Sequence, residues 1–242
     1  MSRTRRRGAT GRFVTTEWSL VVASAEGGAA AGEALAELCR IYWPPVYAHL
    51  RRRGADPERA LDLTQGFFTK LLEKNYIADA RRERGRFRTF LLTSLHHYTA
   101  NEWDRDHALK RGGNRSPIPI DAADAERGYL FEPSHDETPE RVFDRRWART
   151  LLRTVLDRLR GDSKEREASG FDRIAPFVVG GQESGYRAIA GELGTTEAAV
   201  RVRVHRLRRR FRALVREEVA RTVVDERQIE LEMRHLFRVL AG

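Results

Sequence analysis

The 242-residue chain is 40% hydrophobic and 33% charged, with a net charge of +10 at pH 7 and a single cysteine, Cys39. It can build one large or two small packed domains, but it has no run of 18 apolar residues to span a membrane and no second cysteine for a disulfide or a cysteine-rich zinc site. The positive charge indicates a polyanionic partner, with nucleic acid favoured over an anionic membrane, and the lone thiol fits a cytoplasmic protein.

The first quarter of the chain predicts a basic arm followed by helices. Residues 1–15 are rich in arginine and are expected to form a disordered arm that contacts phosphates. Residues 16–25 predict a short helix, and residues 31–53 predict a longer one. Pro44 and Pro45 are expected to break or kink this longer helix in its middle.

A strong helix start follows, because Asp56 can cap the helix, Pro57 suits its first position and Glu58 adds an acid to its first turn. The helix is predicted to continue to residue 74, with apolar residues along one face. Its opposite face carries a polar stripe at helical spacing, which is made of Glu58, Asp62, Gln65 and Thr69. A polar stripe on an otherwise apolar helix favours a surface that binds a partner.

Residues 86–106 predict a helix in which basic residues alternate with aromatic ones. This mixture suits single-stranded nucleic acid, because bases stack on aromatic rings while cations meet the backbone. The alternative is that the aromatic residues belong to the core. We favour the core for Phe87 and Phe90, and both readings stay open for Tyr98 and Trp103.

The composition changes between residues 108 and 138, where glycines and prolines punctuate the chain. Seven acids against one base, Arg127, make residues 121–140 acidic in an otherwise basic protein. We therefore predict an all-α fold of two small helical domains, residues 16–107 and 139–222, joined by a flexible acidic linker over residues 108–138.

The second domain is predicted to begin at Thr138, Pro139 and Glu140, which repeat the cap, first-turn proline and acid. Apolar residues four positions apart then follow one face, namely Phe143, Trp147, Leu151, Val155 and Leu159. A further helix is expected over residues 171–179.

Residues 186–214 form the pattern of a helix-turn-helix. A short amphipathic helix over residues 186–193 should end at Gly194, where a left-handed residue is wanted. Thr196 is the expected N-cap of the second, longer helix.

The outward face of this second helix carries small residues at its start and basic residues along its length. Its predicted DNA-contacting residues are Thr196, Ala198, Arg201, Val202, His205, Arg206, Arg208 and Arg209. Arginines suit phosphates and guanine edges. The apolar Val202, on the solvent-facing side of the helix, suits contact with a thymine methyl group. The alternative is a solvated basic helix without a partner, but the glycine turn, the cap and the basic face together favour DNA.

Residues 223–242 exceed what a minimal helix-turn-helix domain needs. Asp225 and Gln228 form a capping-box pattern ahead of an amphipathic helix over residues 226–240. This C-terminal extension is expected either to close the core of the second domain or to regulate access to DNA or polymerase.

The whole resembles a bacterial RNA polymerase sigma factor of the extracytoplasmic-function (ECF) type, in a subgroup with a C-terminal extension. The resemblance covers about residues 30–106 and 140–216. It is carried by residues 62–68 (DLTQGFF), which are similar to the D-L-x-Q-E-x-F signature of the clamp-binding helix, by residues 87–92 (FRTFLL) and by residues 193–200 (LGTTEAAV).

The resemblance implies a protein that binds core polymerase at its clamp helices and flap, initiates transcription at specific promoters and catalyses no reaction itself. It implies no cofactor and no metal, and an anti-sigma factor as a further partner. The polar stripe would hold the clamp, with Gly66 in place of the family's usual Glu on that face. The helix-turn-helix would read the −35 element, while the loop of residues 75–85 would capture a flipped base of the −10 element. The implied −10 strand contacts are Tyr76, Arg86, Arg88, His97, Asn101, Trp103 and Arg105.

Two other functions are compatible with a basic helical protein. A metalloenzyme is disfavoured, because the adjacent His96 and His97 cannot face one metal from one helix and no HExxH pair is present. A stand-alone helix-turn-helix regulator is the serious alternative. It would leave the polar stripe without a role, and retention on core polymerase would separate the two functions.

Overall fold

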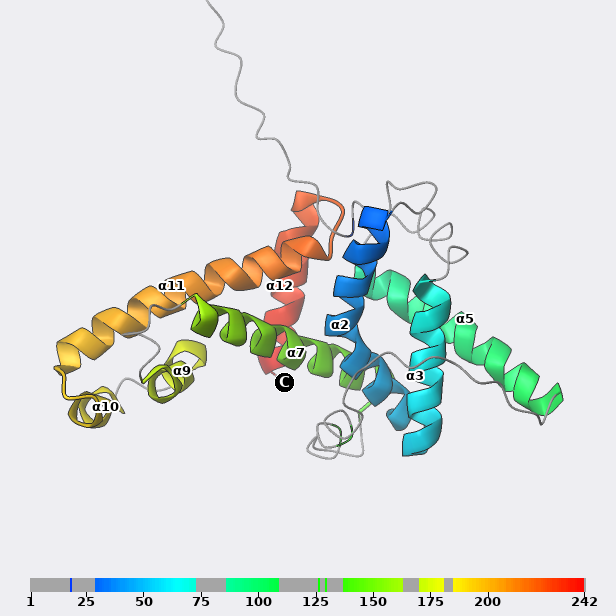
Figure 1. Cartoon of the computed structure of the whole chain (residues 1–242), viewed down its shortest axis with the longest axis horizontal. Helices are drawn as coiled ribbons and strands as arrows, with labels where there is room; N and C mark the ends of the chain where they lie inside the picture. The colour runs from blue at the N-terminus through cyan, green and yellow to red at the C-terminus, as the bar shows by residue number, and fades with distance from the viewer. Residues whose placement is uncertain are drawn as a thin grey trace, which may run out of the picture.

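The computed structural model describes residues 18, 29–72, 86–108, 126, 129, 137–162, 170–180 and 185–241. Within these ranges the fold is all-α, as predicted, and Figure 1 shows the arrangement of its helices. They are α2 (Ala29–Arg52), α3 (Pro57–Leu72), α5 (Phe87–Ala108), α7 (Pro139–Gly161), α9 (Phe171–Val179), α10 (Tyr186–Glu192), α11 (Glu197–Arg221) and α12 (Glu226–Ala241). None of these helices has the length and apolarity that crossing a bilayer requires. The predicted arm of residues 1–15, the loop of residues 75–85 and most of the predicted linker lie outside the described residues.

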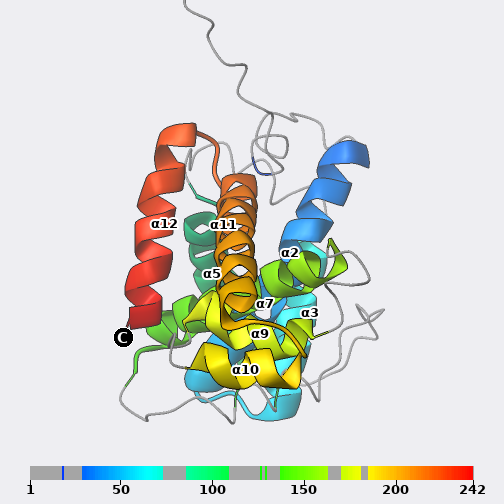
Figure 2. The same ribbon diagram turned by 90° about the vertical axis from the view of Figure 1, so that its left-hand side faces the viewer.

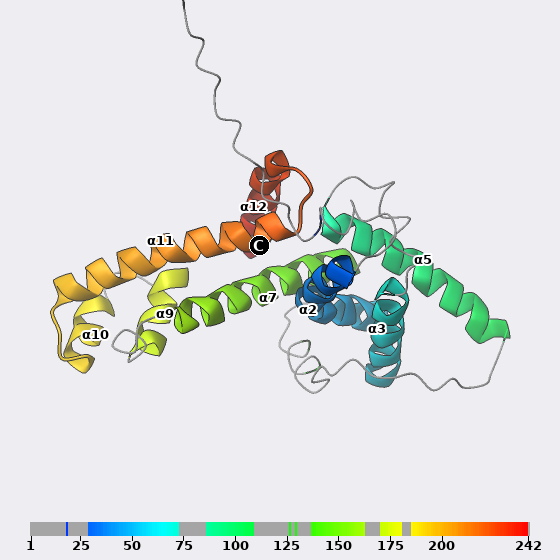
Figure 3. The same cartoon turned by 45° about the horizontal axis from the view of Figure 1, so that its top comes forward.

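Helix α2 lies at the centre of the fold. It packs against α3 and, most extensively, against α7. The long helix α11 runs beside α7, with α9 and α10 packed near its beginning and α12 near its end (Figures 1 and 3). The helices predicted for the two halves of the chain therefore share a large interface, with α7 as the element in common.

Pro44 and Pro45 lie inside α2 and do not end it, so of the two expected outcomes the break does not occur, and the kink stays a prediction. Each proline removes a backbone donor and disfavours a helix interior. Their neighbours Trp43 and Val46 are buried, in a helix that packs against both α3 and α7. Burial on these two faces holds the segment helical against the local preference.

Helix α3 begins as predicted, because the Asp56 carboxylate accepts a hydrogen bond from the backbone nitrogen of Arg59 at 2.8 Å. Its buried face includes Leu63, Phe67 and Phe68. Gly66 is also buried, so it belongs to the core side of α3 and not to the exposed polar stripe as expected. The glycine therefore removes no charge from the exposed face of α3.

Helix α7 begins as predicted, with the Thr138 hydroxyl accepting from the backbone nitrogen of Arg141 at 3.3 Å. All five apolar residues expected on its inner face are buried: Phe143, Trp147, Leu151, Val155 and Leu159. They join one continuous cluster of buried side chains that reaches from Trp18 to Leu236. One apolar core thus extends through both predicted halves of the chain.

Three aromatic residues of α5, Phe87, Phe90 and Tyr98, face this core. Phe87 and Phe90 are buried, as predicted, and their rings contact Trp18 at centroid distances of 5.0 and 5.1 Å. Tyr98 is only 1% exposed and packs beside Phe67. It is therefore a core residue and presents no stacking surface to a base.

Candidate nucleic-acid interface

The segment from α10 to α11 has the turn and the cap that its sequence predicts. Gly194 adopts a left-handed backbone with φ +61°, and a β-carbon there would meet nothing within 4 Å. Glycine is therefore required at this position by the left-handed backbone angle, and not by a lack of space for a side chain. The Thr196 hydroxyl then accepts from the backbone nitrogen of Ala199 at 3.2 Å and caps α11.

The first half of α11 presents an exposed basic face, which we define as Ala198, Arg201, Val202, His205, Arg206 and Arg209. Val202 is 67% exposed, the highest value among the large hydrophobic side chains of the described residues. On the opposite side Val200, Val204 and Leu207 are buried. Figure 2 views the molecule from the end at which α10 leads into α11. The sequence thus assigned the inner and outer sides of α11 correctly.

Arg208 differs from the other predicted DNA contacts. It is half-buried, and its Nε donates to the backbone carbonyl of Phe177 in α9 at 2.9 Å. This bond fastens α11 to α9, so Arg208 has a structural role in this arrangement. Arg201, by contrast, remains exposed beside its partner Glu197, at 3.2 Å one turn earlier.

The polar stripe of α3 lies on the surface, away from the core. Glu58 and Asp62 are exposed, and Gln65 and Thr69 are half-buried. None of the buried residues of α3 belongs to the stripe, because they occupy the opposite face of the helix. The four side chains form one continuous surface that a partner could contact.

The residues predicted to contact the −10 strand fall into three groups: exposed residues, residues outside the described ranges, and residues that form ion pairs within the protein. His97 and Asn101 lie exposed on α5. Tyr76 and the side chains of Trp103 and Arg105 lie outside the described residues. Arg86 is half-buried and Arg88 is buried, and both carry ion pairs to the C-terminal helix.

We call the ion pairs around Arg88 the Arg88 cluster, made of Arg86, Arg88, Asp144, Glu232 and His235. Arg88 meets Glu232 at 3.0 Å and Asp144 at 2.9 Å, while Arg86 meets the other oxygen of Glu232 at 3.2 Å. Burial alone would lower the pKa of Arg88, but the ion pairs with Glu232 and Asp144 raise it above its usual value. His235 lies 3.1 Å from Asp144 and completes the cluster. Arg88 is therefore bound within the protein, which does not fit its predicted contact with a DNA strand.

The backbone reinforces this connection between α5 and the C-terminal extension. The nitrogen of Phe87 donates to the carbonyl of Thr222 at 2.9 Å, and Arg86 pairs with Val223 in an isolated antiparallel bridge. The extension therefore contacts the first half of the chain as well as α7 and α11. Neither expected role for it, closing the second domain alone or regulating access, included this contact.

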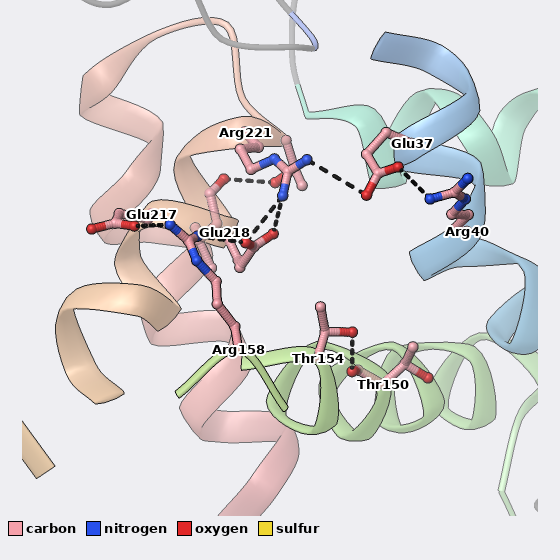
Figure 4. A network of polar contacts seen from close by, with 10 residues as sticks. Glu37, Arg40, Thr150, Thr154, Arg158, Glu217, Glu218 and Arg221 are labelled. Atoms are coloured by element: carbon pink, nitrogen blue, oxygen red, sulfur yellow. Dashed lines mark hydrogen bonds and ion pairs between the residues drawn. The ribbon is translucent and has the colours of Figure 1, made fainter. Parts of the chain in front are cut away.

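A second polar network connects α7, α11 and α2 (Figure 4). Glu218 is 1% exposed and accepts from Arg158 at 3.1 Å and from Arg221 at 2.8 Å. Arg221 also lies 3.9 Å from Glu37 in α2, which is bound to Arg40 at 2.9 Å. The buried carboxylate is compensated by two guanidinium groups, as burial of a charge requires.

Within the predicted linker, Glu126 and Tyr129 are described, and both contact α2. The Glu126 carboxylate accepts from the Arg51 guanidinium at 2.9 and 3.1 Å and from the Tyr47 hydroxyl. Burial alone would raise the pKa of Glu126, but these bonds lower it below its usual value. Arg51 also lies over the ring of Tyr129 at 5.0 Å. At these two positions, acidic and aromatic side chains of the linker are held on the first half of the chain.

His49 stands in the interface between α2 and α7 and is completely buried. Burial lowers its pKa to about 4, while the nearby Pro139 carbonyl and Glu140 act in the opposite direction. Neither ring nitrogen has a hydrogen-bond partner of ordinary geometry. The imidazole is therefore neutral at pH 7.

An apolar cavity of about 310 Å³ opens between α7, α9, α11 and α12. Its wall includes Leu152, Val178, Phe211 and Phe237, and Phe237 is 57% exposed. Such a cavity can receive an apolar side chain of a partner.

Comparison with known proteins gives no relative, because no family model, no curated protein and no solved structure matches the chain. The residues of this chain and the surfaces that they form are therefore what indicates its function.

Proposed function

We propose that this chain is a sigma factor of the ECF type, which binds core RNA polymerase in the cytoplasm and directs it to specific promoters. The observation that carries the proposal is the exposed basic face of α11, which follows a capped turn and lies opposite a fully buried apolar side. The polar stripe of α3 adds a second exposed surface on the other half of the chain. The protein would supply recognition, and the polymerase would supply the chemistry.

The basic face suits the major groove of DNA. Ala198 at its start permits close approach, and Val202 offers an apolar contact to a thymine methyl. Arg201, His205 and Arg206 lie in the first turns, where side chains of a recognition helix reach base edges. Arg209 lies further along and suits a phosphate.

Alanine at Arg206 is expected to cost about 1–3 kcal/mol of binding free energy on the preferred site and to relax preference at one base position. Alanine at Arg209 should instead weaken binding to all sequences and reduce the salt dependence by about one unit of slope. Fluorescence anisotropy on the preferred and a scrambled duplex, repeated across salt concentrations, measures both effects.

The control for this pair is Arg227→Ala, because Arg227 is exposed on α12 and outside the basic face. It should leave both affinities unchanged. Equal weakening of the two duplexes by Arg206→Ala would show that α11 does not read sequence in the proposed way.

The polar stripe is the proposed contact for the polymerase clamp. Asp62 is exposed on α3, so replacing it by arginine should reverse a surface charge without disturbing the core. We expect Asp62→Arg to weaken retention on core polymerase by roughly tenfold or more, because a like charge would face the basic clamp. Pull-down with tagged core enzyme measures the effect, and run-off transcription reports its consequence.

The matched control is Asp157→Arg, which makes the same charge change at an exposed position of α7. Retention equal to wild type for both variants would remove the stripe from the polymerase interface. A wild-type chain that binds DNA but is not retained by core polymerase would instead establish a stand-alone DNA-binding regulator.

The apolar cavity beside Phe211 and Phe237 supports the second proposed polymerase contact. An exposed phenylalanine next to an apolar cavity suits contact with an apolar side chain of a partner, and we assign this surface to the flap. For the −10 strand, the proposal rests on the exposed His97 and Asn101. Contact through Arg88 would require α12 to release it from the Arg88 cluster.

A further inference from the structure

Three helices bring metal-binding side chains together at one point of the interface. His49 comes from α2, His96 from α5 and Glu140 from the first turn of α7, and their donor atoms all lie within 4.8 Å of one another. His96 Nε2 is 3.7 Å from Glu140 Oε1, and the two imidazole rings have centroids 5.7 Å apart. No local sequence pattern predicts this cluster, because its members are 47 and 44 positions apart along the chain.

The state of His49 is a second, independent observation. Its side chain is 0% exposed, and neither ring nitrogen has a hydrogen bond of ordinary geometry, although the Pro139 carbonyl is near enough to act on its pKa. A buried polar group without a partner costs free energy, and native structures seldom keep one without a reason. A metal ion bound to one of its nitrogens would supply the missing interaction.

We propose that His49, His96 and Glu140 bind a zinc ion. Imidazole and carboxylate are ordinary zinc ligands, and two histidines with one glutamate leave a fourth position for water. Ligand atoms of a tetrahedral zinc site lie about 3.3 Å apart, so the donor atoms must approach one another slightly. His96 and Glu140 are 47% and 50% exposed, which leaves their side chains free to make this adjustment around a fixed His49.

Zinc at this position would connect α2 and α5 with α7. It would therefore join the two predicted halves of the chain at a point separate from the Arg88 cluster and from the Glu218 network. The inference does not depend on the proposed function, because it concerns the binding of the metal alone.

The test uses the full-length chain, freed of metal with a chelator and then titrated with Zn²⁺ against a chromophoric chelator. We expect one zinc ion per chain for the wild type. Loss of an outer-shell partner already lowers metal affinity by about 10–100-fold, so His96→Ala and Glu140→Gln, which remove direct ligands, should each weaken binding by about 100-fold or more. Visible absorption of the Co²⁺ form should show a tetrahedral site in the wild type and lose it in both variants.

The control is His97→Ala, which removes an exposed neighbouring imidazole and should bind zinc like the wild type. Both ligand variants alter half-exposed side chains, and circular dichroism checks that they keep the wild-type helix content. His49→Ala is not used, because it would open a buried space. Absence of a tight site in the wild type, or equal zinc affinity in wild type, His96→Ala and Glu140→Gln, would overturn the proposal.

Discussion

Replacing Phe143 by alanine is expected to lower the free energy of unfolding by about 3–5 kcal/mol. Phe143 is 0% exposed in the interface between α2 and α7. Its ring contacts Tyr42 at a centroid distance of 6.2 Å and His49 at 6.4 Å. Truncation removes this apolar burial and leaves a cavity between helices that are held by packing on both sides. Urea unfolding followed by circular dichroism measures the loss.

The control is Phe237→Ala, because Phe237 is 57% exposed and its loss should change stability by no more than about 0.5 kcal/mol. Since the buried cluster is continuous, we also expect Phe143→Ala to shift one cooperative transition. Two separated transitions, with only one of them shifted, would show that the predicted halves unfold independently.

The second large effect is expected at Glu232, whose side chain is 0% exposed and is bound to Arg86 and Arg88. Alanine there would leave the buried Arg88 with Asp144 as its remaining partner in the Arg88 cluster. Removal of one member of a buried ion pair costs about 3–5 kcal/mol, because the other charge stays out of water. The same unfolding measurement detects it.

Glu230→Ala provides the matched comparison, because Glu230 lies on the same helix with 59% exposure and pairs with Arg216. An exposed pair contributes roughly 0–1 kcal/mol, so this variant should unfold close to wild type. A double variant that also replaces Arg88 by methionine should recover part of the stability lost in Glu232→Ala. Equal, small losses of unfolding free energy for the Glu230 and Glu232 variants would show that the Arg88 cluster contributes little to stability.

Local structure was predictable from the sequence because its causes are local. Thr138 and Thr196 cap their helices with hydroxyls that bond three residues ahead, and Gly194 supplies the left-handed turn. The inner face of α7 was likewise fixed by apolar spacing. The outer and inner sides of α11 followed from the same periodicity, so the exposure of Val202 could be anticipated.

Contacts between distant segments were not predictable, since no local rule connects them. Arg88 and Glu232 are 144 positions apart, and each alone has the character of an ordinary surface charge. Tyr98 could have been a stacking platform or a core residue, and only the packing against Phe67 decides. Pro44 shows the opposite case, in which a strong local rule is overcome by burial on two sides of α2.

Helix α11 contains 25 residues, which gives a rod about 37 Å long. Its final turns are held by Glu218 against α7, while the basic face occupies its opening turns. Its opening turns are held as well, because α9 and α10 pack beside them and the Arg208 Nε donates to the Phe177 carbonyl at 2.9 Å. The rod is therefore anchored near both ends. We expect the basic face to keep a constant orientation relative to α7, so that a partner must adapt its own position to that of the rod.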